Sequence, residues 1–318
     1  MSILWILLGI VLFCAVATLA ISYGCFRMGF YAPRKKKADS DAIETPEGAI
    51  YDPYRPKMEQ WVREARQLPR QHFTVQSFDG LTLHGDFFEY APGAPMELMF
   101  HGYRGSAERD LSGGVQRCFK IGRSVLLVDQ RCSCRSEGDV ITFGIKEHRD
   151  CLTWVNFLVD HFGPDIKIIL TGISMGAATV MMTADKDLPP NVLGILADCG
   201  YSSPKAIICK VIRDMKLPPK LADPFVKLGA RIFGHFDLEE DSPEEALRNA
   251  KVPVIFYHGE ADDFVPCDMS RSNYEVCASR KALVTIPGAG HGLSYALDPE
   301  RYLQTLSDFF GPEGTAKK

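Results

Sequence analysis

The pattern of apolar and polar positions divides the chain into an apolar N-terminal run, a polar linker and a long body. From Ser2 to Phe26 the sequence carries no charged residue. A helix of about 20 residues is long enough to cross the ~30 Å hydrocarbon core of a bilayer. We therefore predict a transmembrane anchor at residues 1–26.

A cleaved secretory signal is an alternative for this run, because Ala15-Val16-Ala17 is typical of a cleavage site; a buried helix of a soluble protein is another. A signal begins with basic residues, whereas the first basic residue here is Arg27. Basic flanks stay on the cytoplasmic side, so the body is expected in the cytoplasm, as part of a single-pass membrane protein. The basic residues after the run are Arg27, Arg34, Lys35, Lys36 and Lys37.

Residues 27–70 combine prolines with charges, which predicts a juxtamembrane linker with a short helix over Met58–Gln67. We expect it to act as a tether that sets the distance of the body from the membrane. Its basic residues also suit anionic lipid headgroups.

Residues 71–312 alternate between strand-length apolar runs and helix-length stretches such as Lys146–Phe162 and Asp268–Ser279. At the start, Asp79-Gly80 is a strong two-residue hairpin signal. The pattern predicts an α/β fold, with a mostly parallel sheet, helices on both faces and antiparallel strands at its beginning. The predicted strands are His72–Phe78, Leu81–Tyr90, Glu97–Phe100, Ser124–Asp129, Ile166–Thr171, Val192–Ala197, Val252–Tyr257 and Ala282–Ile286.

The exception within the body is residues 201–250, where no strand is evident. Apolar residues recur there at helical spacing in Ala206–Met215 and Pro224–Phe233. We interpret this insertion as a helical cap over the functional site. Residues 313–318 form a short tail.

Composition excludes several classes of protein. A net charge of −4 is too close to neutral for a protein that binds nucleic acid through its phosphates, so no nucleic-acid partner is expected. Ten cysteines form no CxxC pair and no Cys/His cluster, which favours free thiols over a disulfide framework or a zinc site. No metal or organic cofactor is implied.

The predicted chemistry centres on Gly172-Ile173-Ser174-Met175-Gly176, which matches G-x-S-x-G. The motif lies between a predicted strand and the helix-compatible stretch Ala177–Asp185, which is the context of a nucleophilic serine on a tight strand-to-helix turn. Glycines are needed there because side chains would clash. An ordinary turn serine is the alternative.

A serine nucleophile needs a general base and an orienting carboxylate. His291 lies between glycines in a loop after the last predicted strand, and is the expected base. Asp262 follows the preceding strand and is the preferred acid, with Asp263 a near rival and Asp198 a distant one. The chain order Ser, Asp, His is the one this type of site uses.

Two backbone N–H groups are needed to stabilise an oxyanion. We expect one from Met175, directly after the nucleophile, and the second from Tyr103 in the Gly-rich loop after the first parallel strand. His101, in the same loop, is expected to brace it rather than to act in catalysis.

Five ordered motifs resemble those of the α/β-hydrolase superfamily, in particular its membrane-tethered bacterial branch of serine aminopeptidase-like (S33-type) hydrolases. The motifs are His101-Gly102-x-x-Gly105, Asp129-Gln130-Arg131, Gly172-x-Ser174-x-Gly176, His258-Gly259-x-x-Asp262-x-x-Val265-Pro266 and Gly290-His291-Gly292. The resemblance implies the α/β-hydrolase fold and a Ser174–Asp262–His291 triad. It is specific for fold and triad and poorly specific for substrate.

One departure from the family pattern follows Asp129-Gln130-Arg131, where Cys134 stands at a position often held by glycine. Cys132 and Cys134 form a C-x-C pair, which without nearby ligands is weak support for a metal or redox role. Asp129 and Arg131 are expected to brace this loop beside the site.

The resulting prediction is a serine hydrolase that cleaves a carboxylic ester, thioester or amide through an acyl-enzyme on Ser174. A serine aminopeptidase acting on short peptides is an alternative, and the acidic run Asp237–Asp241 is a candidate for holding the substrate amine. A catalytically idle, membrane-anchored binding protein is the alternative from another class.

Overall fold

The computed structural model describes residues 2–33 and 42–311. Arg34, Lys35, Lys36 and Lys37 of the predicted basic flank and the predicted tail 313–318 lie outside the described residues. The elements in chain order are α1 (Ser2–Gly29), α2 (Arg55–Gln67), β1 (Gln71–Gln76), β2 (Thr82–Phe88), β3 (Met96–Phe100), α3 (Ala107–Lys120), β4 (Ser124–Asp129), α4 (Glu147–Phe162), β5 (Ile168–Ile173), α5 (Met175–Met181), β6 (Val192–Asp198), α6 (Pro204–Asp214), α7 (Pro219–Phe233), α8 (Pro243–Arg248), β7 (Val254–Gly259), α9 (Cys267–Val276), β8 (Lys281–Ile286), α10 (Ser294–Leu297) and α11 (Pro299–Phe310).

The strands form one sheet in the order β1-β2-β4-β3-β5-β6-β7-β8. The β1–β2 and β2–β4 pairs are antiparallel, and every later pair is parallel. The predicted fold class, a mostly parallel sheet with antiparallel strands at its start, is confirmed. Because the parallel strands share one direction, the loops after β3, β5, β7 and β8 meet at one edge of the sheet.

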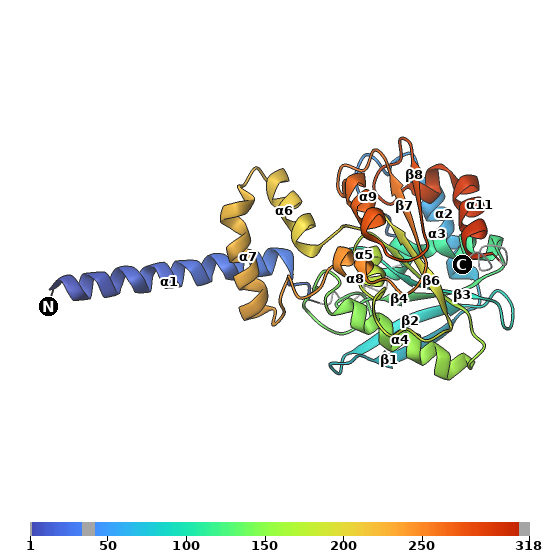
Figure 1. Ribbon diagram of the computed structural model, residues 1–318, viewed down its shortest axis with the longest axis horizontal. Helices are drawn as coiled ribbons and strands as arrows, with labels where there is room; N and C mark the ends of the chain where they lie inside the picture. The colour runs from blue at the N-terminus through green and yellow to red at the C-terminus, as the bar shows by residue number, and fades with distance from the viewer. Residues whose placement is uncertain (1, 34–41, 312–318) are drawn as a thin grey trace.

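Apolar residues line both faces of the sheet because successive side chains of a strand point to opposite faces. In β7, Phe256 packs in the cluster formed with α4, α5 and α9, whereas its neighbour Ile255 packs with α11. Helix α3 covers β4 on the same side as α2 (Figure 1). The sheet is therefore buried on both faces, which explains its continuous apolar runs.

Helix α1 is a single apolar helix that projects from the rest of the molecule (Figure 1). Its residues Ile3–Gly29 are long and apolar enough to cross a membrane, by the same measures that a signal sequence would meet. The C-terminal half packs against α7, where Ser22 and Phe26 are buried. A Cβ on Gly229 of α7 would lie 2.4 Å from the Ser22 carbonyl oxygen, so the two helices approach closely at this glycine.

Residues 42–67 have a larger packing role than the predicted tether. The predicted helix is present as α2, which packs on α3 and buries Val62 and Ala65. The predicted helices of residues 201–250 are also present, as α6 and α7 with the short α8. However, α7 packs on α1, to one side of the sheet (Figure 1).

Candidate active site

Ser174 lies on the sharp turn between β5 and α5, as the G-x-S-x-G pattern predicts. Its φ of 56° is in the left-handed region, which a side chain rarely adopts. A Cβ on Gly172 would lie 2.1 Å from the Gly176 carbonyl oxygen, and one on Gly176 would lie 2.0 Å from that of Phe100. Both glycines are therefore needed for the backbone to close around the serine.

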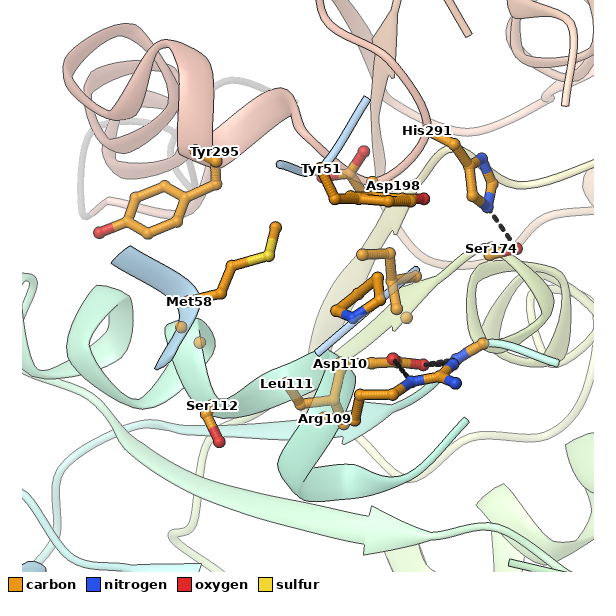
Figure 2. Close-up of a pocket in the computed structure, with 18 of the residues that line it drawn as sticks. Tyr51, Met58, Arg109, Asp110, Leu111, Ser112, Ser174, Asp198, His291 and Tyr295 are labelled. Carbon is orange, nitrogen blue, oxygen red and sulfur yellow. Dashed lines mark hydrogen bonds and ion pairs between the residues drawn. The ribbon is translucent and has the colours of Figure 1, made fainter. Parts of the chain in front are cut away.

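The structure brings the three residues of the predicted triad together. The Ser174 hydroxyl oxygen is 2.9 Å from His291 Nε2, and His291 Nδ1 is 2.7 Å from Asp262 Oδ2 (Figure 2 draws the first of these bonds). An ionised Asp262 accepts a hydrogen bond from Nδ1–H, which leaves Nε2 without a proton and able to accept the serine proton. This arrangement matches that of a nucleophile with its base and orienting acid.

Asp262 is buried and both of its carboxylate oxygens accept hydrogen bonds, which favours the ionised form. Its Oδ1 accepts hydrogen bonds from the amides of Phe264 and Val265, at 3.0 and 2.8 Å. Burial by itself would raise the pKa of Asp262, but hydrogen bonds from His258 and His291 hold that pKa well below its ordinary value. The acid therefore stays negatively charged beside the imidazole.

His258 is a supporting residue whose role the sequence did not indicate. Its Nε2 lies 3.2 Å from Asp262 Oδ2 and 2.8 Å from the Val265 carbonyl oxygen, and its Nδ1 is 2.7 Å from Ser270 Oγ. Because both partners of Nε2 are oxygen acceptors, this nitrogen carries the proton. In the sequence, His258 was visible only as part of the His258-Gly259 pair at the end of β7.

Neither rival acid contacts His291. Asp198 is buried, and its two oxygens accept hydrogen bonds from Ser294 and Tyr302, at 3.0 and 3.1 Å. Burial raises the pKa of Asp198. Asp263 lines the pocket described below, next to Phe264. Of the three candidates, only Asp262 has the geometry of an orienting acid.

The loop expected to supply an oxyanion donor lies beside Ser174. A Cβ on Gly102 would be 3.5 Å from Ser174 Cβ, and the Gly102 amide donates to Asp110 Oδ2 at 3.1 Å. Gly105 leaves room for the same carboxylate, since a Cβ there would lie 2.1 Å from Asp110 Oδ2. Met175 begins helix α5, so its N–H has no acceptor within the helix. The roles of the Tyr103 and Met175 amides remain predictions.

The side chains of this loop reach the end of α1. The Tyr103 hydroxyl donates to the Gly29 carbonyl at 2.7 Å, and Arg104 donates to the carbonyls of Met28 and Tyr31 at 2.9 and 3.1 Å. The last carbonyls of a helix have no partner inside the helix. Here the loop beside Ser174 satisfies them.

His101 links the loop to the end of β4 through hydrogen bonds, which is consistent with the bracing role expected of it. Its Nε2 accepts from the Gln130 amide at 3.0 Å, so Nδ1 carries the proton and donates to the Gly102 carbonyl at 2.8 Å. Burial lowers the pKa of His101 below its ordinary value, so the ring is neutral. Arg131 makes two 2.7 Å hydrogen bonds to Asp150, and Asp129 Oδ1 accepts from the Ala107 amide at 3.3 Å.

Cys132 and Cys134 both adopt left-handed backbone conformations, with φ of 66° and 46°. This explains why glycine would suit position 134. Among the described residues, the group of side chains that meets the spacing of a metal site is Cys199, Asp262 and His291. The His291 imidazole of that group is already hydrogen-bonded to the Asp262 carboxylate and to the Ser174 hydroxyl. Burial keeps the pKa of the Cys199 thiol well above its ordinary value. These residues do not fit a metal.

A pocket of about 550 Å³ opens next to Ser174 and His291. Figure 2 shows it extending from these two residues towards Met58 and Tyr295, with Tyr51 above it. Residues 46–51, Met58 and Trp61 form much of its wall. Residues 201–250 are all described, and none of them lines it. The helices of the predicted cap therefore do not line this pocket, and α7 packs on α1 instead.

Comparisons with known proteins agree with this architecture. Protein-family models give no match to the chain. The uncharacterized protein YqkD of Bacillus subtilis is 24% identical over 298 residues, which is 93% of this chain and 94% of that protein. The structure of the Pyrococcus furiosus esterase Pf2001 aligns with a TM-score of 0.63 at 20% identity, covering 85% of this chain and 98% of the esterase. The Pyrococcus horikoshii acylaminoacyl peptidase aligns at 0.56 and 18%, covering 80% and 43%.

Proposed function

The chain has the α/β-hydrolase fold, and on that premise we propose that it is a serine hydrolase that cleaves a carboxylic ester. The observation that carries the proposal is the continuous hydrogen-bond chain Ser174–His291–Asp262, at 2.9 and 2.7 Å. The esterase Pf2001 shares the fold, which makes ester hydrolysis the first reaction to test.

In the proposed reaction, His291 Nε2 takes the hydroxyl proton of Ser174 while Oγ bonds to the substrate carbonyl carbon. The carbonyl electron pair moves to oxygen, where the amides of Tyr103 and Met175 are the expected donors. When the intermediate collapses, the carbon–oxygen bond to the alcohol breaks and His291 protonates the leaving alcohol. His291 then deprotonates a water molecule, whose oxygen bonds to the acyl carbon. The bond from that carbon to Ser174 Oγ breaks, the acid is released, and His291 returns the proton to Ser174.

The pocket favours an apolar acyl chain. Ile50, Met58, Trp61 and Met99 contribute apolar walls within reach of Ser174. Burying each methylene of a substrate contributes about 0.8 kcal/mol. Longer acyl chains should therefore bind better until the pocket is filled.

The aminopeptidase alternative has weaker support, although the acylaminoacyl peptidase has the same fold. The acidic run Asp237–Asp241 does not line the pocket. Instead, Asp237 pairs with Arg231, Glu239 with Lys205 and Asp241 with Lys186. A catalytically idle binding protein would not require Ser174, His291 and Asp262 to be joined by hydrogen bonds.

We also propose that α1 is a retained single-pass anchor, with the body in the cytoplasm. Removing α1 would leave the apolar face of α7 at Val226 and Ala230 without the partner that buries it. Loss of α1 would also leave Tyr103 and Arg104 without their carbonyl acceptors. Arg27 and the basic residues after it favour the cytoplasmic orientation.

The test uses the full chain in nanodiscs and a fluorophosphonate, which reacts with an activated serine. We expect Ser174→Ala to abolish labelling, while Ser307→Ala, on helix α11, labels as the wild type does. Equal labelling of Ser174→Ala and wild type would contradict the proposal. Hydrolysis of p-nitrophenyl esters of graded chain length, against aminoacyl-arylamides, then separates the two substrates: activity on arylamides alone would overturn the ester assignment.

A further inference from the structure

Helix α7 carries an apolar stripe that is exposed at both of its ends and partly exposed between them. Leu221, Phe225, Leu228 and Ile232 are spaced at i, i+4, i+7 and i+11, so they share one side of the helix. Leu221 is 69% exposed and Ile232 41%, and the other two are partly exposed. The turn before the helix adds Met215 and Leu217, at 47% and 48%.

The other two sides of α7 are occupied. Val226, Gly229 and Ala230 face α1. Lys227 and Arg231 pair with Glu239 and Asp237, in the segment that returns from α7 to the body. By helical spacing, the apolar stripe is turned by roughly a third of a turn from each of these two sides. It therefore faces neither α1 nor the segment that returns to the body.

The position of α7 along α1 coincides with the end of a bilayer span. With a rise of about 1.5 Å per residue, the stretch Ile3–Tyr23 covers roughly the ~30 Å of a hydrocarbon core. The contact between α1 and α7 is centred on Ser22 and Phe26, at the C-terminal end of that stretch. Figure 1 shows α7 crossing α1 rather than running along it. A helix in this position lies at the level of the lipid headgroups.

We propose that α7 and the turn that precedes it lie in the surface of the same bilayer that α1 crosses. The stripe and the turn residues Met215 and Leu217 enter the boundary between headgroups and acyl chains. The exposed cations Arg213, Lys216 and Lys220 flank them and match anionic headgroups. The occupant of this surface is lipid because the stripe continues the lipid-facing surface of α1. This inference rests on the proposal that α1 is a membrane anchor.

Tryptophan fluorescence in vesicles with brominated acyl chains tests this placement, because bromine quenches only indoles within the membrane. The full chain is reconstituted in phosphatidylcholine with phosphatidylglycerol. The Trp5→Phe background removes the indole of α1 and leaves Trp61 and Trp154 in the body. Leu221→Trp then reports on the stripe. Tyr90→Trp is the matched control, exposed and hydrogen-bonded to Ser124 at the opposite edge of the sheet.

We expect the emission of Leu221→Trp to be blue-shifted and strongly quenched, and that of Tyr90→Trp to be unchanged by bromine. Equal quenching of the two variants would overturn the proposal, as would shielding of the stripe by a second copy of the chain. If Leu221→Trp does not fold, Ile232→Trp on the same stripe replaces it. Quenching of Trp5 in the wild type tests α1 separately: an unquenched Trp5 refutes the anchor and this inference with it.

Discussion

Two segments outside the α/β core, residues 46–67 and residues 201–250, differ in what they do for the site. The first lies close to α1 in sequence and forms much of the pocket wall. The second is inserted late in the sheet, where a cap is expected, yet it docks on α1 and leaves the pocket to the first. The place of an insertion in the topology therefore does not decide which segment covers a site.

What decides it is the shape and polarity of the docking faces. On α3, a Cβ at Gly113 would lie 2.6 Å from the Trp61 ring, so the helix is flat where residues 46–67 pack. On α7, a Cβ at Gly229 would lie 2.4 Å from the Ser22 carbonyl oxygen. Each segment thus packs at a glycine, which lets the Trp61 ring approach α3 and the backbone of α1 approach α7. The predictions below disturb one side of this comparison at a time.

The largest expected effect concerns Glu97, which supports α3 beneath residues 46–67. Glu97 is buried between Arg117 and Arg123, and although burial would raise its pKa, these two charges lower it to about 2. The unfolded pKa is about 4.3, so the ionised group stabilises the fold above pH ~4.3, and this contribution of roughly 3 kcal/mol is lost as the pH falls towards 2. Urea unfolding of the full chain between pH 6 and pH 3 measures it.

Glu97→Gln is the control for this titration. It should cost about 3–5 kcal/mol at pH 7, because it leaves two buried guanidinium groups without a counter-charge. The difference in free energy of unfolding between wild type and variant should shrink on acidification. A difference that stays constant from pH 6 to pH 3 would contradict the assigned titration.

Next in size is Trp61→Ala, which removes part of the pocket wall. The half-buried ring stacks on Tyr295 with centroids 5.6 Å apart, so we expect a loss of about 2 kcal/mol, below the ~3–5 kcal/mol of a fully buried aromatic residue. In kcat/KM, the loss should be larger for long-chain esters than for acetate. Arg63→Ala, an exposed change on the same helix, should alter neither. Equal losses for short and long esters would remove Trp61 from the acyl site.

On the other side of the comparison, Gly229→Leu should separate α7 from α1. Overpacking of this kind costs about 1–3 kcal/mol. We expect faster proteolysis of the α6–α7 segment in nanodiscs, with fluorophosphonate labelling of Ser174 little changed. Gly24→Leu is the matched control on α1, because a Cβ at Gly24 meets no atom within 4 Å. Loss of labelling in Gly229→Leu alone would mean that the two regions are coupled.

The smallest effect is expected from Tyr103→Phe, which removes the hydrogen bond to Gly29 and keeps the backbone N–H. The loss of one such bond costs about 1 kcal/mol in the thermal or urea stability of the full chain. Activity should fall only a few-fold, well below the ~10²–10³ expected when an oxyanion donor is lost. A fall of that larger size would assign the hydroxyl a part in the reaction itself.

The sequence predicted the sheet and the three central side chains because both leave local signals. Glycines flank both Ser174 and His291, and a buried strand precedes each of them. These patterns can be recognised in the sequence without knowledge of the tertiary structure. The sequence favoured Asp262 but left Asp263 as a near rival, because both residues follow β7 in the same loop. It also missed the pocket wall at Tyr51 and Trp61, since that wall depends on the flat face of α3 at Gly113, a feature of the folded surface.

The hydrogen bonds from Tyr103 and Arg104 to the end of α1 have a mechanical consequence. Those two residues sit in the loop next to Ser174, so the helix and the loop are linked in series. Any displacement of α1 along its own axis must either break these bonds or drag the loop with it. For the membrane anchor proposed above, a change in bilayer thickness that displaces α1 would therefore also displace the loop beside Ser174.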